Sequence, residues 1–397
     1  MNRTTTATVI GGGIAGAVCA MALQRAGITA TIYEAHIGSD EAVGGGLTLA
    51  PNGVAALDVI GCGDLVRELG DPMTGIVLES WNGKQLGAFT SGGEDQAALF
   101  LWRGRFSAAL RAEAAARGIR ILSGARFVDA VSDADAVEAR FADGTTARAE
   151  VLIGADGIHS RVRSVIDPAA PDPSYTGLVG YGGARAGSGL APSHGTMRMS
   201  FGKRAFFGYR VNDDGTAEWF ANLPSAVPPT SEQLRARSAE ATLDILRAAF
   251  ADDRTRAADL IAGSDPASLV TVGPLEIMPR LPHWSRDGVV VIGDAAHAAS
   301  PSSGQGASLA IESAIELARH LRDLPRDEAL AAYETARRPR VERIIAAAEK
   351  TNSSKAAGPV GRVVRDLVMP VAMRMMRPER QSWQTDYRIA WDAGVAR

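Results

Sequence analysis

The sequence has little of several residue types, and each shortage excludes a class of protein. Two cysteines, Cys19 and Cys62, are too few for a disulfide framework or a multi-cysteine zinc site. The six histidines stand in no HExxH pattern, so we expect no metal site. Forty-two basic and 45 acidic residues leave a net charge of −3, which provides no basic field for a nucleic acid partner.

Long apolar runs are also missing. Met1–Ala7 is short and polar, and the apolar run Val9–Leu23 contains four glycines and is too short to span a bilayer. We therefore expect a cytoplasmic protein with no membrane partner. The 397 residues, 46% of them hydrophobic, suffice for two to three ordered globular domains or for one large α/β domain with an insertion.

The N-terminus has the hydrophobic pattern of a βαβ unit. Thr8–Ile10 reads as a buried strand, Ile14–Ala26 as a helix that stops at Gly27, and Thr29–Tyr33 as a second strand rich in β-branched residues. A buried strand of the parallel kind recurs near the other end, at Gly288–Ile292. These Rossmann-like segments are predicted to belong together.

Between them the pattern changes to antiparallel strands. An early hairpin is predicted around the turn Asn82-Gly83. After the breaker-rich junction Pro168–Pro173, four consecutive strands follow, and then a helix at Ser231–Phe250 and a shorter one near Ala257–Ala262. The four strands are Leu178–Arg185, Thr196–Phe201, Arg204–Val211 and Thr216–Asn222. The sequence thus predicts an antiparallel sheet inserted between Rossmann-like parts.

The first strand is followed by a G-x-G-x-x-G motif formed by Gly11, Gly13 and Gly16. It opens a helix, and Glu34 stands 18 residues beyond it, as the dinucleotide fingerprint requires. Gly11 permits the turn, Gly13 lets the backbone approach a pyrophosphate, and Gly16 lets the helix pack on the strand. Glu34 is predicted to accept a hydrogen bond from a ribose.

Three further segments stand out. Gly154–Arg163 and Gly293–His297 each follow a predicted strand, and Pro301–Gly306 comes shortly after the second of them. In this order they resemble the fingerprints of the class A, para-hydroxybenzoate-hydroxylase-like flavoprotein monooxygenases, over nearly the whole chain. The length is most similar to the salicylate-hydroxylase and tetracycline-modifying branch. The Trp-x-Trp-x-Ile-Pro signature of flavin halogenases is absent.

This resemblance implies the fold and its divisions. The expected fold class is α/β, a GR2-type Rossmann FAD-binding domain with an inserted antiparallel β-sheet substrate domain and a helical C-terminus. We expect the FAD-binding domain in residues 1–172, with a substrate-facing β segment near 75–100, and again in 286–355. The substrate domain is expected in 173–285, and the C-terminal helical segment in 356–397.

The resemblance also implies which residues contact FAD. Arg103 matches the family's arginine better than Arg105, and Asp294 matches the aspartate that binds the ribityl chain, although an Asp there also suits a helix N-cap. The predicted FAD contacts are Gly11, Gly13, Ile14, Ala15, Gly16, Glu34, Gly46, Leu47, Arg103, Asp156, Gly157, Arg161, Gly293, Asp294, Pro301, Gly304, Gln305 and Gly306. Arg161 and Arg163 are either contacts to pyridine-nucleotide phosphates or solvated.

Pro301 and Gly304 are predicted to act in catalysis, because a helix N-terminus behind small residues stabilises negative charge on a reduced flavin. His297 is assigned either a positioning role or direct proton transfer, and His159 a structural one. Tyr209 is the third predicted catalytic residue.

The inserted sheet is predicted to form the substrate pocket. Its candidates are Met197, Met199, Phe207, Tyr209 and Trp219, each of which either faces the pocket or packs within the sheet. Because side chains alternate along a strand, Phe206 and Phe207 cannot both face the pocket. Arg185, Arg198 and Arg210 either bind an acidic group of the substrate or face solvent.

The implied activity is an FAD-dependent monooxygenase that consumes NADPH or NADH and O₂. It would hydroxylate or epoxidise an aromatic or polycyclic molecule through a C4a-hydroperoxyflavin, as a monomer or homodimer. An FAD-dependent reductase or oxidase and a non-catalytic flavin-bound scaffold are the alternatives. The C-terminal stretch Val360–Arg377 is read as a capping helix, with a lid or membrane-surface helix as the other possibility.

Overall fold

Strands from both ends of the chain meet in one sheet. The computed structural model describes residues 4–38, 45–90, 97–352, 358–375 and 382–395. The six-stranded sheet has the order β18-β19-β12-β1-β2-β8, parallel except for the pair β18–β19. Its strands are β1 (Thr6–Ile10), β2 (Thr29–Glu34), β8 (Arg120–Ser123), β12 (Val151–Gly154), β18 (Ser285–Arg286) and β19 (Val289–Val291). The predicted βαβ unit and its junction with the later strand are confirmed.

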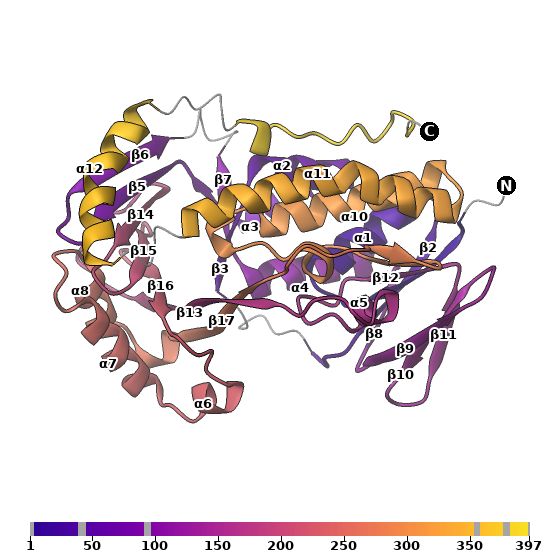
Figure 1. The fold of residues 1–397 in the computed structure, drawn as a ribbon, viewed down its shortest axis with the longest axis horizontal. Helices are drawn as coiled ribbons and strands as arrows, with labels where there is room; N and C mark the ends of the chain where they lie inside the picture. Colours follow the sequence, from indigo (N-terminus) through magenta and orange to yellow (C-terminus); the bar gives the residue numbers. More distant parts are fainter. Residues whose placement is uncertain (1–3, 39–44, 91–96, 353–357, 376–381, 396–397) are drawn as a thin grey trace.

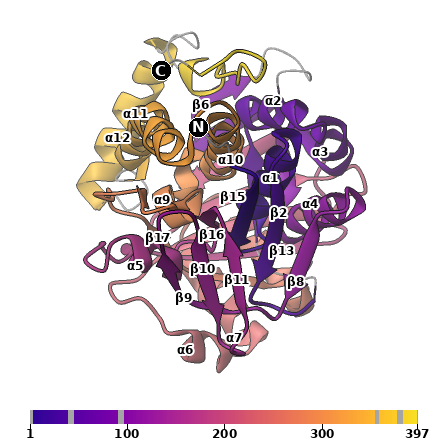
Figure 2. The ribbon, with the colours of Figure 1, turned by 90° about the vertical axis from the view of Figure 1, so that its right-hand side faces the viewer.

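Helices cover one face of this sheet and a small sheet lies beside it (Figures 1 and 2). The packed helices are α1 (Ile14–Arg25), α2 (Pro51–Val59), α3 (Gly63–Leu69), α4 (Arg103–Ala116), α10 (Gly306–Asp323) and α11 (Arg326–Asn352). The small antiparallel sheet comprises β9 (Phe127–Ser132), β10 (Val137–Phe141) and β11 (Thr146–Ala149), and α5 (Arg161–Ile166) packs on β9. The buried aliphatic residues of β1, β12 and β19 form the centre of this core.

A seven-stranded sheet forms the other half of the molecule, on the left of Figure 1. Its order is β17 (Val270–Ile277), β13 (Ser174–Arg185), β16 (Ala217–Pro224), β15 (Phe206–Val211), β14 (Thr196–Phe201), β5 (Gly75–Ser80) and β6 (Gln85–Thr90). The predicted hairpin β5–β6 is confirmed, and Gly83 has the positive φ of 80° that its turn requires. The hairpin extends this sheet because β5 pairs in parallel with β14.

Helices lie under one face of the large sheet. They are α6 (Ser231–Arg235), α7 (Ala239–Phe250) and α8 (Ala257–Ala262). The sequence pattern predicts one helix from 231 to 250, but the structure has two, because Ser238 accepts a hydrogen bond from the Ala241 amide and caps a new start. The aliphatic side chains of α7 and α8 pack on β15 and β16 as a second core.

The remaining elements before the C-terminal helix and after it are short. They are β3 (Gly46–Leu49), β4 (Asp71–Met73), β7 (Ala98–Trp102), α9 (Asp294–His297) and the 3₁₀ turns Pro266–Ser268, Pro301–Ser303 and Ser382–Gln384. β3, β7 and β4 form a three-stranded sheet in the order β3-β7-β4. The domain limits at residues 172, 285 and 355 stay a prediction.

The helix α12 (Pro359–Met375) lies along the edge strand β6. Met369 and Met373 face inward, while Val363, Leu367 and Val371 on its outer side are 56–66% exposed. It therefore caps a sheet edge and not the main core. Residues 376 and 377 of the predicted stretch lie outside the described residues. None of the described helices is both long and apolar enough to cross a bilayer.

Candidate active site

The glycine turn after β1 opens into a large cavity. Gly11 has φ 101°, and a Cβ there would collide with the backbone of Ala155, while a Cβ on Gly16 would collide with the carbonyl of Gly11. A Cβ on Gly13 would meet nothing within 4 Å, because Gly13 faces the cavity. Gly11 and Gly16 therefore shape the turn, and Gly13 leaves room for a ligand at the start of α1.

Glu34 ends β2 at the wall of the same cavity. Its Oε2 accepts a hydrogen bond from the Gly12 amide at 2.6 Å, and its Oε1 accepts one from the His36 amide at 2.9 Å. Burial raises the pKa of Glu34, but the hydrogen bonds from His36 and Gly12 outweigh it, so the net shift is downward. The carboxylate is thus ionised and placed to accept a hydroxyl donor from a ligand.

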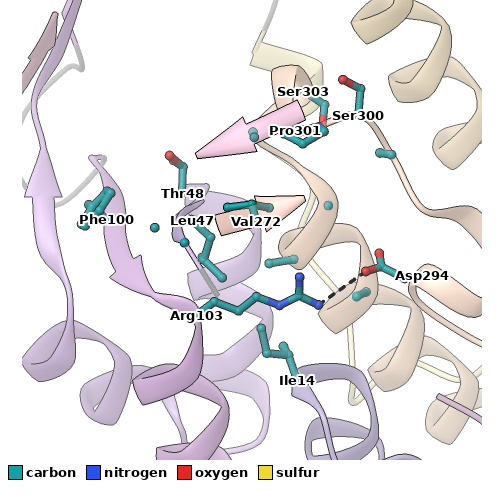
Figure 3. Close-up of a pocket in the computed structure, with 18 of the residues that line it drawn as sticks. Ile14, Leu47, Thr48, Phe100, Arg103, Val272, Asp294, Ser300, Pro301 and Ser303 are labelled. Carbon is teal, nitrogen blue, oxygen red and sulfur yellow. Dashed lines mark ion pairs between the residues drawn. The ribbon is translucent and has the colours of Figure 1, made fainter. Parts of the chain in front are cut away.

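Arg103 and Asp294 face each other across the cavity (Figure 3). Arg103 begins α4 and Asp294 begins α9, and Arg103 Nη2 lies 3.9 Å from Asp294 Oδ2. Burial raises the pKa of Asp294, and the guanidinium of Arg103 offsets part of that rise. Both side chains remain partly exposed to the cavity, with exposed fractions of 62% and 38%. Arg105 does not line it.

In the segment after β12, the Asp156 carboxylate is already hydrogen-bonded to the start of helix α5. Asp156 Oδ1 accepts from the Ser160 hydroxyl at 2.6 Å, and Oδ2 accepts from the amides of Arg161 and Val162. Asp156 and Gly157 line the cavity, but this carboxylate holds the start of α5. Its pKa is raised by burial, against these hydrogen bonds. Its contact with FAD stays a prediction.

The two arginines of this segment have different environments. Arg161 lines the cavity, and its Nε donates to the Val128 carbonyl at 3.1 Å. Arg163 is buried and donates from Nη1 to the Ala295 carbonyl at 3.1 Å. The expectation that Arg163 meets phosphates or solvent is wrong, because its side chain joins α5 to α9.

The turn Pro301–Ser303 leads into α10 at the meeting point of the two halves. Pro301, Gly304 and Gly306 line the cavity, and a Cβ on either glycine would meet nothing within 4 Å. The contact of Gln305 with FAD stays a prediction that concerns its backbone at the start of α10. Its side chain is buried and accepts from Asn52 Nδ2 at 3.0 Å, so it anchors the turn on α2.

Of the other predicted FAD contacts, some line the cavity wall and one lies where helices pack together. Ile14, Ala15, Gly46 and Leu47 line the cavity. Gly293 does not line it. With φ 58° it lets α9 approach α1 and α10, because a Cβ would lie 3.0 Å from Ala15 Cβ and 3.2 Å from Ala310 Cβ.

His297 does not line the cavity. It is buried against Trp284, and its Nε2 lies 3.0 Å from Ser313 Oγ on α10. Burial lowers its pKa to about 3, with a further contribution from Arg337. His297 is therefore neutral at physiological pH and joins α9 to α10, which favours the positioning role over proton transfer. His159 lines the cavity and pairs with Glu276 at 3.0 Å.

The large sheet turns one face to the cavity and the other to α7. Met197 and Met199 line the cavity, and Trp219 borders it, but the Trp219 ring lies in the core beneath the sheet, where its Nε1 donates to Ser264 Oγ at 2.8 Å. Phe207 and Tyr209 are a correction, because they lie in the core beneath the sheet, where Phe207 stacks on Trp219 and contacts Phe250. Alternation along β15 places Phe206 and Arg210 in the cavity instead.

Sequence reasoning missed several residues of the pocket wall. Besides Arg210, the cavity side of the sheet and its neighbours is lined mainly by aromatic and sulfur-containing side chains. These include Met73, Phe100, Trp102, Phe201, Phe220, Met369 and Met373. Phe100 and Trp102 stand two apart on β7, so strand alternation was the available signal, but it does not say which side holds the cavity.

The whole cavity has a volume of about 2210 Å³. Pockets for one small ligand typically span roughly 300–1,000 Å³. The glycine turn, the Arg103–Asp294 pair, the start of α10 and the sheet face therefore bound a space for more than one ligand. A helix N-terminus at an open glycine and an ionised carboxylate at the end of β2 fit the adenosine diphosphate part of FAD.

Comparison with known proteins agrees with this geometry. The family model described as an FAD binding domain matches residues 3–198 and 226–348. An FAD-dependent urate hydroxylase of Mycolicibacterium vanbaalenii is 30% identical over 86% of each chain, and a 6-hydroxynicotinate 3-monooxygenase of Pseudomonas fluorescens is 28% identical over 87% of this chain and 90% of its own. The crystal structure of Klebsiella pneumoniae R204Q HpxO complexed with FAD superposes with a TM-score of 0.82 at 25% identity, covering 96% of this chain and 98% of that one.

Proposed function

Because the chain belongs to the FAD-binding domain family and is a class A FAD-dependent monooxygenase, we propose that it inserts one oxygen atom into an aromatic or polycyclic small molecule. The relatives act on urate and 6-hydroxynicotinate, as their names state. FAD is the cofactor, and NADPH or NADH is the reductant typical of the family. When bound and reduced, FAD would supply the electrons that activate O₂, and O₂ would supply the oxygen atom that is transferred.

Residues from both ends of the chain would hold the FAD. Gly13 with the start of α1 would receive the pyrophosphate, and Glu34 the ribose. Arg103 and Asp294 would bind polar groups on the stretch between the pyrophosphate and the ring. Gly46 and Leu47, which line the same wall, would flank the ring.

The catalytic contribution of the chain is mostly electrostatic and steric. Pro301 and Gly304 would let the ring approach the backbone, and the N-terminus of the 18-residue α10 would stabilise a negative charge placed before it. The apolar sheet face would exclude water and orient the substrate. Tyr209 has no part in this proposal, since its side chain lies beneath the sheet.

One observation carries the proposal, namely that a single cavity joins the glycine turn to the face of the large sheet. Its lining runs from Gly13 and Glu34, past Asp294 and Pro301, to Met197 and Phe220. A cofactor at one end and an apolar substrate at the other would therefore touch in the middle.

The test is a substrate screen on the purified FAD-loaded protein. Flavin bleaching by NADPH and by NADH is followed anaerobically, alone and with aromatic and polycyclic compounds. The products formed under ¹⁸O₂ are then analysed by mass spectrometry. We expect one class of compound to accelerate bleaching and to gain one labelled oxygen. Bleaching and turnover without labelled product would indicate a reductase or oxidase. A flavin that stays oxidised with every reductant would indicate a scaffold.

We also propose a cytoplasmic protein that works as a monomer or homodimer. The two cysteines, Cys19 and Cys62, are free thiols buried in the core, which suits a reducing compartment. Light scattering on the purified FAD-loaded protein decides between the two oligomeric states.

A further inference from the structure

The sheet face that lines the cavity carries two charged residues among those that the structure describes. They are Arg210 on β15 and Glu218 on β16. Around them the lining of this sheet is largely apolar, from strands β5, β14, β15 and β16. It includes Ile76, Leu78, Met197, Met199, Phe206 and Phe220. A polar group of the substrate that meets this wall therefore meets one small charged patch, and Asn222 on β16 is a further polar residue of the lining.

Arg210 and Glu218 are direct neighbours across the two strands. Arg210 Nε donates to Glu218 Oε2 at 2.7 Å, and Arg210 Nη2 donates to Asp71 Oδ2 at 2.6 Å. The guanidinium lies 3.9 Å from the ring centre of Phe100. Trp102 Nε1 donates to Glu218 Oε1 at 3.2 Å. The Arg210 and Glu218 side chains are only 9% and 13% exposed, so this arrangement is held by its surroundings.

The charges of this patch sum to −1, because one guanidinium faces two carboxylates, those of Glu218 and Asp71. The other two arginines of the sheet are also engaged. Arg198 pairs with Glu79 at 2.6 Å on the far side of the sheet, and Arg185 donates to the Asp259 carbonyl at 2.8 Å. A substrate carboxylate would therefore enter a poorly solvated wall whose cation is already neutralised, beside a fixed anion.

We propose that Glu218 makes this enzyme select aromatic substrates that carry a neutral hydrogen-bond donor, and discriminate against aromatic carboxylates. Glu218 accepts the donor of the substrate, and Arg210 orients Glu218. This inference rests on the proposed function, because it assigns the sheet face to the substrate. It makes Glu218 a specificity-determining residue, and it makes Arg210 a positioning residue and not a receptor for an acid.

The test compares two probes of equal shape, 2-naphthamide and 2-naphthoate, on the FAD-loaded protein. Their dissociation constants are measured from the change that they cause in the flavin absorption spectrum. We expect the wild type to bind the amide at least about tenfold more tightly, which corresponds to about 1.4 kcal/mol. Glu218→Gln should remove the repulsion and lower this ratio about tenfold.

Two further variants separate specificity from damage to the fold. Asp71→Asn should shift the ratio of the two dissociation constants in the same direction but less, since the Asp71 side chain is 65% exposed. This variant replaces Glu218→Gln in the test if Glu218→Gln does not fold. Glu79→Gln removes an equivalent carboxylate from the far side of the sheet and should leave the ratio unchanged.

Equal or tighter binding of the naphthoate by the wild type overturns the inference, as does an unchanged ratio in both Glu218→Gln and Asp71→Asn. If the naphthoate binds tightly and accelerates flavin bleaching, the inference fails while the proposed function stands. If neither probe perturbs the flavin, nor do the larger anthracene amide and acid, both fail together.

Discussion

At the scale of the residue, three glycines of one motif have three different tasks. Gly11 and Gly16 are required because a Cβ would collide with nearby backbone. At Gly13 a Cβ would collide with no protein atom, and the glycine keeps space free for the ligand. The spacing predicts these tasks from the known logic of the turn. Which glycine faces a cavity is a fact of the tertiary structure.

Gly13→Val should fold and lose FAD. The new side chain would point into the space where the pyrophosphate is proposed, without displacing a protein atom within 4 Å of the Cβ. FAD affinity should fall at least about tenfold, as measured by flavin content after gel filtration, while circular dichroism stays native. Gly394→Val places the same side chain in open space away from the cavity and should keep its flavin. A fully yellow Gly13→Val would contradict the assignment.

His297 makes the stability of the protein depend on pH. Its pKa of about 3 in the folded state lies below the ordinary value of 6.5, because burial disfavours the charged ring. The unfolded chain therefore binds a proton that the folded chain does not. The stabilisation is complete above pH 6.5 and is lost as the pH falls from there toward about 3, by at most about 1.4 kcal/mol per pH unit.

Urea unfolding between pH 7 and 5.5 checks this. His297→Gln removes the proton uptake of this one residue, so it should reduce the slope of unfolding free energy against pH relative to the wild type. Exposed His283→Gln is the control and should keep the slope. An identical slope in His297→Gln would show that another group causes the loss.

At the scale of the element, strand β15 shows why alternation leaves a choice. Its residues are buried on both faces, so the pattern of hydrophobicity does not mark the side of the pocket. Helices α7 and α8 occupy the side of Phe207, and the cavity takes the side of Phe206. The choice depends on elements that lie elsewhere in the chain.

Phe207→Ala should therefore affect stability before it affects substrate binding. The ring is fully buried against Trp219, Tyr209 and Phe250, and its removal leaves a cavity in this core. We expect the free energy of unfolding to fall by about 3–5 kcal/mol in urea titrations. Val131→Ala, at a position 48% exposed on β9, should cost less than about 0.5 kcal/mol. A loss below about 1 kcal/mol for Phe207→Ala would place that ring outside the core.

The segment Ser382–Gln384 is held over the cavity by helix α11. Arg340 donates from Nη1 to the Trp383 carbonyl at 2.9 Å and from Nη2 to the Gln384 carbonyl at 2.8 Å. Its Nε also donates to the buried Glu312 at 2.9 Å. One side chain thus ties the C-terminal segment to α10.

Arg340→Ala should release this segment without unfolding the protein. Amide hydrogen exchange in residues 382–386 should become at least about tenfold faster, since both carbonyl anchors are lost. Arg280→Ala, which removes a 74% exposed partner of Glu342 on the same helix, is the matched control and should leave this exchange unchanged. Unchanged exchange in Arg340→Ala would mean that other contacts hold the segment.

At the scale of the whole molecule, the cavity separates two sheets that have their own cores. A ligand that touches both sides is expected to stabilise them together, because it binds the folded chain and not the unfolded one. Removal of FAD should therefore lower the melting temperature.

Free FAD at about 100 times its dissociation constant should add about 2.7 kcal/mol to the stability of the stripped protein. Thermal unfolding at increasing FAD concentration measures this. Asp294→Ala should show a smaller increase at the same FAD concentration, because one polar wall of the cavity is lost. A melting temperature that does not depend on FAD would contradict binding in this cavity.

The family, the βαβ unit and most strands follow from the sequence alone, because they depend on local patterns. The turn at Gly11–Gly16, the hairpin at Asn82-Gly83 and the strand before Asp294 each have a signal within a few residues. Backbone geometry and strand periodicity decide such features before any distant contact forms.

The lining of the pocket was decided by the tertiary structure. Glu218 has no special sequence context, and its role arises because register places it opposite Arg210 and because Asp71 and Trp102 reach the pair from other strands. The same packing buried Tyr209, Arg163 and His297. Burial and ion pairing depend on which surfaces meet, and that is set by the assembly of distant segments and not by the residues nearby in sequence.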